Sequence, residues 1–330
     1  MAVSTGISAQ ESDRDGKEWA VTGLSTDFIR EVPDYTGELG DQALMGTLVE
    51  ILDEDGYWVK IKTPEPYTGW VNEMGLVRMD GKAVGEWLKA EKYICTGLFT
   101  HVYEAPSETS GIITDLVLGD ILKTGFGEDG KRLKTKRFVG VELPSGKKGY
   151  VRSEDVTGLR LWAEERLKKE TEDEDGFRQD IEKTARWFVG VPYMWGGTSI
   201  KNVDCSGLTR SVFLANGILL PRNASQQARV GEVIRIKGED GKLDLGGLLK
   251  GDLLFWGREA GDGQEERVTH VGMYLGNGMF IHSSQLVRID SFTTYTRMPL
   301  GARRIIGHAD EKGSGIISMR RSPSYFSESY

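Results

Sequence analysis

The sequence predicts a multidomain protein in which two small all-β barrels are followed by an α+β domain. Two observations predict this architecture. A strand-rich pattern with Gly and Asp turns occurs twice within the first 157 residues, whereas the rest of the chain combines amphipathic helix patterns with a β-hairpin. With 330 residues, the chain is long enough for two or three domains.

The front half of the chain contains a loose internal repeat. Each copy has a strand, a turn, a second strand and a short Gly-aromatic-Val strand. These segments are 44–52, 55–61 and 69–71 in the first copy, and 116–122, 138–143 and 149–151 in the second. The pattern is that of small SH3-like barrels, which we expect over residues 15–80 and 92–157. Barrels that only support the rest of the chain are the alternative to barrels that bind a ligand.

Helical patterns begin after the second barrel. Residues 159–169 predict a helix and the acidic run 170–175 predicts a solvated linker or a helix end, so we expect a helical linker over residues 158–176. The α+β domain should then cover residues 177–310, with a first helix at its start. The remaining segment, 313–330, is rich in serine, and we expect it to be poorly ordered.

Cys205 is the most informative residue of the chain. Asp204 precedes it as a favourable N-cap, and an apolar face follows, which together predict a helix that begins at the thiol. Free backbone N–H groups and the helix dipole at this end would favour the thiolate and could stabilise an oxyanion. A buried structural cysteine is the alternative, and it is commoner for a cysteine considered alone.

Two of the four histidines, His270 and His282, flank a predicted β-hairpin. Its turn lies at Gly276-Asn277-Gly278. A three-residue loop would pair Gly272 with His282 and would place His270 on the same face, one diagonal step away. A two-residue loop would place the two histidines on opposite faces. We expect the three-residue loop.

This register would assemble a nucleophile and its base. Cys205 would attack, His270 would act as general base, and His282 would orient His270 through a ring-to-ring hydrogen bond. A zinc site with one Cys and two His ligands is the alternative, but the sequence offers no fourth ligand nearby, so we expect neither a metal nor another cofactor. His101 and His308 have no such context and receive no role.

Five short motifs occur in a fixed order between residues 178 and 308. They are Tyr193-x-Trp195-Gly196-Gly197, Asp204-Cys205-Ser206-Gly207, Leu220-Pro221-Arg222-x-x-Ser225-x-Gln227, Gly251-Asp252-Leu253-x-Phe255-Trp256 and His270-Val271-Gly272-Met273-Tyr274. Together they resemble the NlpC-type family of papain-like, cell-wall cysteine peptidases. The resemblance implies hydrolysis of a peptide bond in peptidoglycan stem peptides, with Cys205, His270 and His282 as the catalytic residues. The long, charged, Gly-rich stretch 257–267 departs from the family, and we expect a mobile loop at the cleft rim.

The two barrels resemble bacterial SH3-like domains, which commonly precede such peptidases. The combination resembles the subclass that cuts γ-D-glutamyl to L-diamino acid bonds in stem peptides with a free N-terminal L-Ala. A free ammonium needs an anionic pocket, and Asp204 beside the nucleophile could provide it. The first barrel could close the cleft with Tyr67 and Glu38. An ordinary loop aromatic and a solvated turn carboxylate are at least equally common alternatives for these two residues.

Other residues near the nucleophile are candidates for the rest of the substrate. The D-Glu α-carboxylate needs hydrogen-bond donors, and Ser206 and Ser225 meet that need. Tyr193 could hydrogen-bond near the thiolate or the oxyanion, although it could also simply pack on the Gly turn. The sequence does not distinguish diaminopimelate from lysine at the third position of the peptide.

Composition bounds the partners. The net charge of −8 argues against nucleic acid, and no stretch approaches the roughly 20 apolar residues of a membrane span. Residues 1–9 lack the features of a signal peptide, so as written the chain would be cytoplasmic and could recycle muropeptides. If a leader was removed, the protein would act in the periplasm or cell envelope. We expect a monomer.

Two other functions stay open at this point. One is a cell-wall binding module with a vestigial hydrolase domain, against which the intact Cys205, His270 and His282 argue. The other is an amidase or acyltransferase that uses the same thiol on a different amide. Sedimentation with insoluble peptidoglycan tests the first, and an N-acetylated peptide tests the second.

Overall fold

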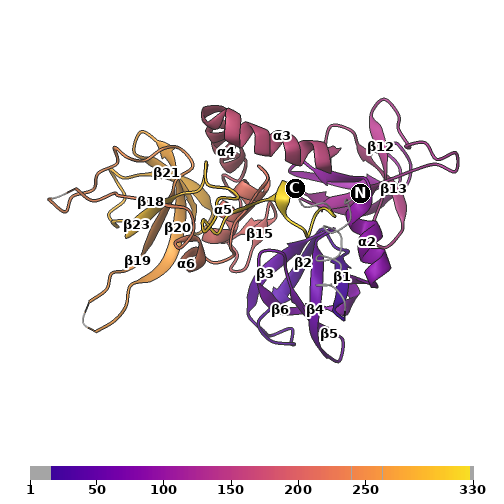
Figure 1. The fold of residues 1–330 in the computed structure, drawn as a ribbon, viewed down its shortest axis with the longest axis horizontal. Helices are drawn as coiled ribbons and strands as arrows, with labels where there is room; N and C mark the ends of the chain where they lie inside the picture. The colour runs from indigo at the N-terminus through magenta and orange to yellow at the C-terminus, as the bar shows by residue number, and fades with distance from the viewer. Residues whose placement is uncertain (1–15, 239, 262, 328–330) are drawn as a thin grey trace, which may run out of the picture.

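The computed structural model describes residues 16–238, 240–261 and 263–327. Three β-sheet units follow one another along the chain, and helices lie after each barrel and within the last unit (Figure 1). The two N-terminal units lie next to each other, and the third lies to one side of them (Figure 1). The expectation about a signal peptide concerns residues 1–9, which lie outside the described residues.

The first unit, which we call the first barrel, is an antiparallel sheet of seven strands with the order β3-β2-β6-β5-β4-β1-β7. Its elements are β1 (Glu18–Thr22), β2 (Thr26–Arg30), β3 (Leu39–Leu44), β4 (Leu48–Asp55), β5 (Trp58–Lys62), β6 (Thr68–Asn72), η1 (Glu73–Gly75) and β7 (Leu76–Met79). Seven small or β-branched side chains form its core, namely Ala20, Ile29, Ala43, Val49, Val59, Ile61 and Val71. Apolar burial on one side of each strand is the physical basis of this unit.

The second barrel repeats the strand order of the first, as β10-β9-β13-β12-β11-β8-β14. Its strands are β8 (Lys92–Cys95), β9 (Phe99–Tyr103), β10 (Ile112–Val117), β11 (Ile121–Thr124), β12 (Phe138–Glu142), β13 (Lys148–Arg152) and β14 (Val156–Gly158). Strands β8 to β14 occupy the same places in this sheet as β1 to β7 do in the first. The internal repeat in the sequence therefore corresponds to a repeat in topology.

Helix α2 (Gly81–Lys89) joins the two barrels and was not expected from the sequence. Asp80 caps it by accepting a hydrogen bond from the backbone of Ala83 at 2.8 Å. The helix buries Val84, Trp87 and Leu88. This pattern of a cap followed by apolar residues three or four apart was present in the sequence, but it covers only two turns.

The barrels dock directly on each other through their turns. The backbone N–H of Met45 donates to the carboxylate of Asp120 at 2.9 Å, and the N–H of Ile121 donates to the carbonyl of Met45 at 2.9 Å. Gly46 lies at this contact with φ of +83°, and a Cβ there would come within 2.3 Å of the Ile121 carbonyl oxygen. The close approach of two backbones therefore fixes one barrel on the other.

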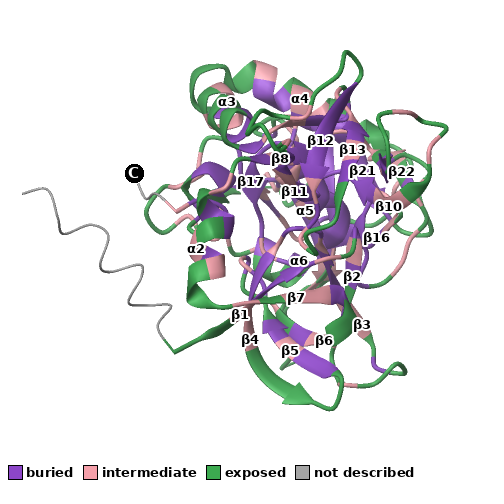
Figure 2. Cartoon of the chain, turned by 90° about the vertical axis from the view of Figure 1, so that its right-hand side faces the viewer, coloured by how far each residue is buried: buried purple, intermediate pink, exposed green. Residues whose placement is uncertain are grey.

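The third unit, the C-terminal domain, places helices against an antiparallel sheet of six strands, β18-β23-β19-β20-β21-β22. Its helices are α3 (Leu159–Glu172), α4 (Glu174–Trp187), α5 (Cys205–Leu214), α6 (Ala224–Gln227) and η2 (Met319–Arg321). Its strands are β15 (Thr198–Ser199), β16 (Asn202–Val203), β17 (Ile218–Leu219), β18 (Glu232–Ile234), β19 (Leu253–Arg258), β20 (Arg267–Gly276), β21 (Met279–Ser283), β22 (Val287–Ser291), β23 (Gly301–Arg304) and β24 (Ile317–Ser318). Figure 2 shows buried residues on α5 and on the strands of both barrels, whereas much of α3 is exposed.

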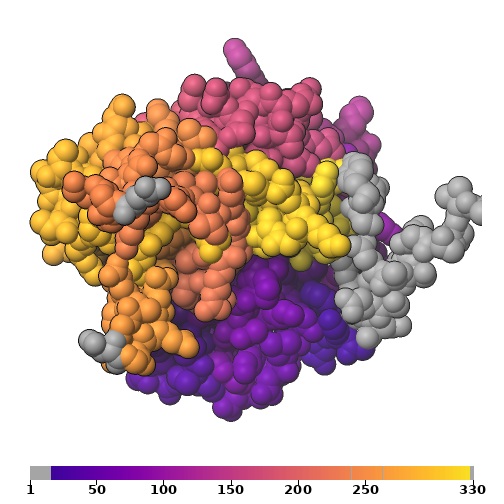
Figure 3. Space-filling view, turned by 60° about the vertical axis from the view of Figure 1, so that its left-hand side comes forward, coloured from indigo at the N-terminus to yellow at the C-terminus, as the bar shows by residue number. Residues whose placement is uncertain are grey.

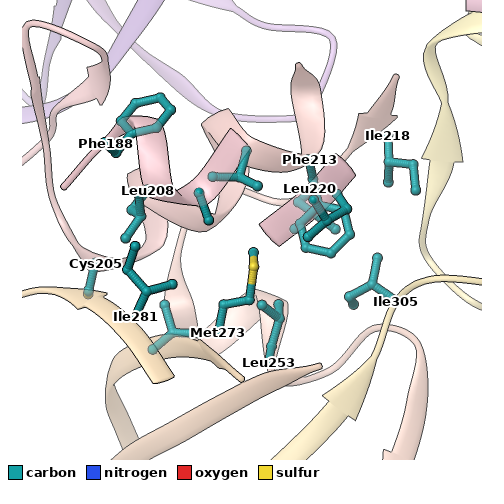
Figure 4. Packing of buried hydrophobic residues seen from close by; sticks show 14 of the residues in the cluster. Phe188, Cys205, Leu208, Phe213, Ile218, Leu220, Leu253, Met273, Ile281 and Ile305 are labelled. Atoms are coloured by element: carbon teal, nitrogen blue, oxygen red, sulfur yellow. The ribbon is translucent and has the colours of Figure 1, made fainter. Parts of the chain in front are cut away.

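The main core of this domain lies between α5 and the sheet (Figure 4). Leu208 and Phe213 of α5 pack with Met273 of β20 and Ile281 of β21, and all four are at most 1% exposed. Because Cys205 begins the same helix, this packing also fixes the position of the thiol relative to the two histidine-bearing strands.

The acidic run 170–175 is helical rather than a linker. It ends α3 and begins α4, and Asp173 between them caps α4 by accepting from the N–H of Gly176 at 3.1 Å. Asp and Glu at a helix N-terminus interact favourably with the dipole, which explains why this run continues as helix. Of the two expectations for this run, the helix end is therefore confirmed and the solvated linker is not.

The segment after Gly313 is also placed differently from the expectation of a poorly ordered tail. Ile317–Ser318 pairs with Ile218–Leu219, and Met319, Tyr325 and Phe326 are at most 7% exposed. These three side chains join a cluster with residues of both barrels, α2 and α3. Figure 3 shows this segment in yellow along the boundary between the first barrel and the C-terminal domain. Its apolar residues, rather than its serines, decide its placement.

The hairpin has the predicted register but not the predicted loop. Gly272 pairs with His282, as expected. The turn, however, contains only Asn277 and Gly278, both with positive φ, and the register shifts between Tyr274 and Gly276. This bulge adds one residue to β20, so a two-residue turn gives the pairing that we had assigned to a three-residue loop.

Candidate active site

The first turn of α5 carries the candidate nucleophile. Asp204 is the N-cap, as predicted, and its Oδ1 accepts from the N–H of Gly207 at 2.7 Å. A Cβ on Gly207 would lie 1.9 Å from the carbonyl oxygen of Gly197, so only glycine permits this approach. Cys205, the first residue of the helix, is 7% exposed.

Burial governs the ionisation of this thiol. It raises the pKa of Cys205 to about 11, and the neighbouring Asp204 charge raises it further, while the backbone of Val271 and of Ser206 acts in the opposite direction. The expectation that the helix N-terminus would favour a thiolate is therefore wrong for the protein alone, because desolvation of the charge outweighs the dipole. The backbone hydrogen bond from Val271 places the sulfur beside the residue that follows His270.

His270 and His282 make the contact that the register predicts. Nε2 of His270 lies 2.7 Å from Nδ1 of His282, with the two rings nearly perpendicular at 82°. Burial lowers the pKa of His270 to about 3, with nearby positive groups adding to the effect. His270 is therefore a neutral base at neutral pH. The ring of Trp256 supports it at a centroid distance of 5.7 Å.

A carboxylate lies behind the second histidine. Nε2 of His282 is 3.0 Å from Oδ2 of Asp290, and Nε of Arg288 donates to the same oxygen at 3.1 Å. Burial lowers the pKa of His282, whereas Asp290 acts to raise it. Our sequence reasoning missed Asp290. The signal was the alternation in Val287-Arg288-Ile289-Asp290, which places Arg288 and Asp290 on one face of a strand.

A cleft of about 910 Å³ runs between the first barrel and the C-terminal domain. The five residues that we predicted to bind the substrate's charged groups line this cleft, whereas Tyr193, His270 and His282 are not among its lining residues. From the C-terminal domain come Asp204, Ser206 and Ser225, and from the first barrel come Tyr67 and Glu38. The nucleophile Cys205 also lines this cleft, and Arg267 to Thr269 form part of its rim.

The stretch 257–267 contributes to this rim, but it is less of a loop than expected. Gly257 and Arg258 continue β19 and pair with Val268 and Arg267 of β20. The two strands extend together beyond the rest of the sheet (Figure 1).

Glu31 is a further cleft residue that the sequence did not reveal. The hydroxyl of Tyr67 donates to its Oε1, and burial together with this carboxylate raises the pKa of Tyr67. The backbone N–H of Glu31 donates to the carbonyl of Glu38 at 3.0 Å, so the two carboxylates flank one turn. Gly40 leaves room for Tyr67, since a Cβ there would lie 1.8 Å from its hydroxyl. Tyr67 and Glu31 are 36 positions apart in the chain, so no local sequence pattern reveals their contact.

Asp204 is more heavily engaged than expected. Both of its oxygens contact the guanidinium of Arg222, and the N–H of Gly196 donates to Oδ2 at 3.0 Å. Asp204 is 5% exposed, and its carboxylate is paired with the buried guanidinium of Arg222. It therefore organises the site and is a poor candidate for a free anionic anchor.

Arg222 also links the nucleophile to the first barrel. Its Nε lies 2.8 Å from Oδ1 of Asp41, and Arg210 makes two further contacts with the same carboxylate at 2.8 and 2.9 Å. Nη2 of Arg210 in turn lies 2.8 Å from Glu65. A buried network of alternating charges thus crosses from the first barrel to the residue before Cys205.

Tyr193 lies near the nucleophile, as the sequence suggested. Burial raises its pKa to about 12, and the Cys205 and Asp204 charges contribute to this shift. It is therefore a neutral hydrogen-bond donor.

Among the described residues, no group of three or more His, Cys, Asp or Glu side chains is arranged to hold a metal ion. No helix in the described part of the chain is long and apolar enough to cross a bilayer.

Comparisons with known proteins agree with this geometry. Residues 190–301 match the NlpC/P60 family, and residues 23–77 match the bacterial SH3 domain. A gamma-D-glutamyl-L-lysine dipeptidyl-peptidase of Bacillus cereus is 30% identical over 259 residues, which cover 76% of this chain and 69% of the relative. Dipeptidyl-peptidase 6 of Lysinibacillus sphaericus is 29% identical over 253 residues, or 76% of this chain and 82% of the relative.

A solved structure shares the arrangement of the units. The crystal structure of an NlpC/P60 family protein from Bacillus cereus covers 87% of this chain and 99% of its own, with a TM-score of 0.70 and 24% identity. Its likeness supports the fold, a β-rich SH3-like region followed by a papain-like domain. The thiol at a helix start, the two histidines on adjacent strands and the relatives' identity lead to one conclusion: the chain belongs to the NlpC/P60 family of cysteine peptidases.

Proposed function

We propose that this peptidase hydrolyses the γ-D-glutamyl to L-diamino acid bond of peptidoglycan stem peptides that carry a free N-terminal L-Ala. The observation that carries the proposal is the cleft between the first barrel and α5, in which Cys205 faces a wall with two carboxylates, Glu31 and Glu38. A wall of this kind limits how far a peptide can extend beyond the nucleophile. It also suits a positively charged end. Two relatives, from Bacillus cereus and Bacillus subtilis, carry names that specify γ-D-glutamyl-L-lysine peptides.

In this proposal, the ammonium of L-Ala binds at the first barrel. Glu31, held by Tyr67, is the main acceptor, and Glu38 lies across the same turn. Asp204 contributes indirectly, because its carboxylate is already paired with Arg222. The hydroxyls of Ser206 and Ser225 line the same cleft and are placed to bind the D-Glu α-carboxylate.

The reaction would proceed by acyl transfer from a neutral resting pair. His270 removes the thiol proton of Cys205 as the sulfur attacks the γ-carbonyl carbon, and a thioester forms when the C–N bond breaks. The backbone N–H of Cys205 and the hydroxyl of Tyr193 stabilise the oxyanion. Protonated His270, a strong acid in its buried site, gives its proton to the departing amine. Water, deprotonated by His270, then releases L-Ala-D-Glu.

This specificity would place the enzyme after another reaction. In an intact cell wall, the L-Ala amine is acylated, so an amide-cleaving reaction must release the peptide first. We therefore propose a role in cell-wall turnover or muropeptide recycling, carried out by a monomer.

We further propose that the second barrel is a second SH3-like domain, because its seven strands repeat the order of the first. Its contact with the first barrel through Asp120 suggests a supporting role.

The test is cleavage of defined tripeptides, followed by mass spectrometry. We expect L-Ala-γ-D-Glu-L-Lys or its diaminopimelate analogue to yield L-Ala-D-Glu, and Cys205→Ala to yield none. Cys95→Ala serves as a matched control, because Cys95 is a buried free cysteine in the second barrel. An N-acetylated tripeptide should be cut at least about tenfold more slowly, since a neutral amide forgoes a charge-assisted contact worth roughly 1.5–3 kcal/mol. Equal cleavage of both peptides would contradict the closed, anionic pocket and would favour a general amidase.

A further inference from the structure

Three neighbouring strands present one polar side chain each to the same face of the sheet. Gly272 of β20 pairs with His282 of β21, and His282 pairs with Arg288 of β22. Since side chains alternate along a strand, His270 and Asp290, each two residues from a paired position, share the face of His282. The result is a line of contacts from His270 to His282 at 2.7 Å and from His282 to Asp290 at 3.0 Å.

The position of protons along this line follows from the donor and acceptor inventory. An ionised carboxylate can only accept, so the His282 nitrogen that faces Asp290, Nε2, must carry a proton. A neutral imidazole carries one proton, so Nδ1 of His282 is an acceptor. His270 must then donate from Nε2, which leaves the lone pair of its Nδ1 free. A single carboxylate thereby determines the tautomer of both rings.

Burial makes this arrangement necessary. The His282 side chain is 1% exposed, so water is not an alternative partner for its Nε2, whereas Asp290 is 24% exposed. Arg288 holds the same Asp290 oxygen that faces His282. Phe280 and Tyr295 pack against the His282 ring at centroid distances of 5.3 and 5.7 Å and restrict its rotation.

We propose that Asp290 is a positioning residue that keeps Nδ1 of His270 unprotonated and available to the Cys205 thiol. The inference rests on the proposed roles of Cys205 and His270 and adds a fourth member to their array. Without the carboxylate, His282 can adopt its other tautomer and donate from Nδ1 to Nε2 of His270. His270 would then carry its proton on Nδ1 and could not act as the base.

Asp290 also acts after the proton has moved. The charged groups that face His270 are Asp204 near the start of α5, Arg288 on β22 and Arg297 after β22. The two arginines and burial disfavour an imidazolium at His270. Asp290, reached through His282, is the negative charge on the far side of the array. It offsets part of this repulsion while His270 is protonated.

The test compares three variants on the tripeptide substrate. We expect Asp290→Asn to lower kcat by about 10- to 100-fold, as is usual for a residue that orients a site ligand, with KM changed less than about threefold. Asp290→Glu should recover part of the loss, because it restores a carboxylate, which unlike the Asn amide can only accept and carries a negative charge. Glu311→Gln is the matched control, since Glu311 contacts Nδ1 of His308 at 2.7 Å, an exposed pair outside the site. A kcat and a pH profile for Asp290→Asn equal to those of the wild type would overturn the proposal.

A second measurement needs no substrate and no variant that must fold. Nitrogen-15 NMR of histidine-labelled wild-type protein near pH 7.5 should show His282 protonated at Nε2 and His270 protonated at Nε2. Protonation of His282 at Nδ1 would refute the proposal. If the wild type shows the predicted tautomers but cuts no γ-D-glutamyl peptide, the array is supported and the proposed substrate is wrong. The two conclusions can therefore fail separately.

Discussion

Cys205 and His270 both lie where burial disfavours their charged forms. The pKa of the thiol is raised to about 11 and that of the imidazole is lowered to about 3. At neutral pH the resting pair is therefore a thiol beside a neutral imidazole. Proton transfer has to accompany attack on the substrate, and this protects the nucleophile from reaction with other electrophiles.

The lowered pKa of His270 predicts a dependence of stability on pH. Between about pH 6.5 and pH 3, the unfolded chain binds a proton at this side chain and the folded chain does not. The contribution of His270 to the free energy of unfolding should therefore be largest above pH 6.5 and should fall as the pH is lowered through this range, opposite in sign to that of Asp27, whose pKa burial raises to about 7. His270→Asn should reduce the slope by up to one proton. Urea unfolding at pH 4, 5, 6 and 7 measures both slopes, and equal slopes would contradict the shift.

Among single residues, the sequence was sufficient to identify the candidate catalytic residues and insufficient for those that face them from other strands. Cys205, His270 and His282 lie in local motifs with their own signals. Glu31 and Asp290 do not, because each acquires its role through a contact, with Tyr67 and His282 respectively, that only strand pairing creates. The Asp204 carboxylate was visible, but its partner Arg222 was not identified as such, so its assigned role was too direct.

Elements position these residues through close backbone contacts. The first turn of α5 approaches the Gly196-Gly197 turn so closely that Gly207 has no room for a Cβ. Helix α2 also contains a glycine, Gly85, but a Cβ there would meet nothing within 4 Å. The two positions form a matched pair, because both are helical glycines and only one is in contact.

We expect the same substitution to have opposite effects at these two positions. Gly85→Ala should stabilise the protein by about 0.5–1 kcal/mol through helix propensity alone. Gly207→Ala should destabilise it by about 1–3 kcal/mol and lower kcat/KM, because the clash moves the start of α5 and the Cys205 thiol with it. Chemical denaturation and tripeptide kinetics measure the two effects. Stabilisation by Gly207→Ala would contradict this prediction, because it would show that the Gly196-Gly197 turn moves to make room for the Cβ.

The β20–β21 hairpin shows how an element can be predicted correctly for an incomplete reason. The pairing of Gly272 with His282 followed from the need to place two histidines together, and it is confirmed. The loop that produces it was wrong, since a bulge before Gly276 and a two-residue turn replace the three-residue loop. A bulge has no clear composition signal, so loop length alone does not determine register.

The whole molecule is joined by buried charges between the first barrel and the C-terminal domain. Asp41 is fully buried and contacts both Arg210 and Arg222. A second interdomain ion pair, between Asp115 of the second barrel and Lys201, has a distance of 2.6 Å, but its side chains are 29% and 34% exposed. The two pairs differ mainly in burial.

Removal of the carboxylate should therefore lower the free energy of unfolding strongly at Asp41 and only slightly at Asp115. Asp41→Ala removes the carboxylate that two buried guanidiniums share, leaving Arg222 with Asp204 and Arg210 with Glu65, and should cost about 3–5 kcal/mol. It should also raise KM for the tripeptide, because the wall that carries Glu31 and Tyr67 is no longer fixed to α5. Asp115→Ala should cost less than about 1 kcal/mol, as expected for a solvated pair. Thermal unfolding and steady-state kinetics measure both, and similar losses for the two variants would contradict this assignment.

At this scale, the sequence indicated the order of the units but not their interfaces. The repeat and the motif order predicted two barrels followed by a papain-like domain, because each unit has its own periodic pattern. The contacts of Met45 with Asp120 and of Arg222 with Asp41 join residues 75 or more positions apart. The segment after Gly313 was misjudged for the same reason, since its partners lie in other units.

The hydroxyl of Tyr325 donates to Oε1 of Glu65 at 3.4 Å, across a separation of 260 residues. A contact of such high order cannot form until the ribosome has translated the intervening domain. The first barrel can fold early. Its contact with α5, which Glu65 makes with Arg210, is joined by Tyr325 only after the C-terminal domain has been translated. A nascent chain would thus hold the Cys205 thiol before this contact between the first barrel and the C-terminal segment has formed.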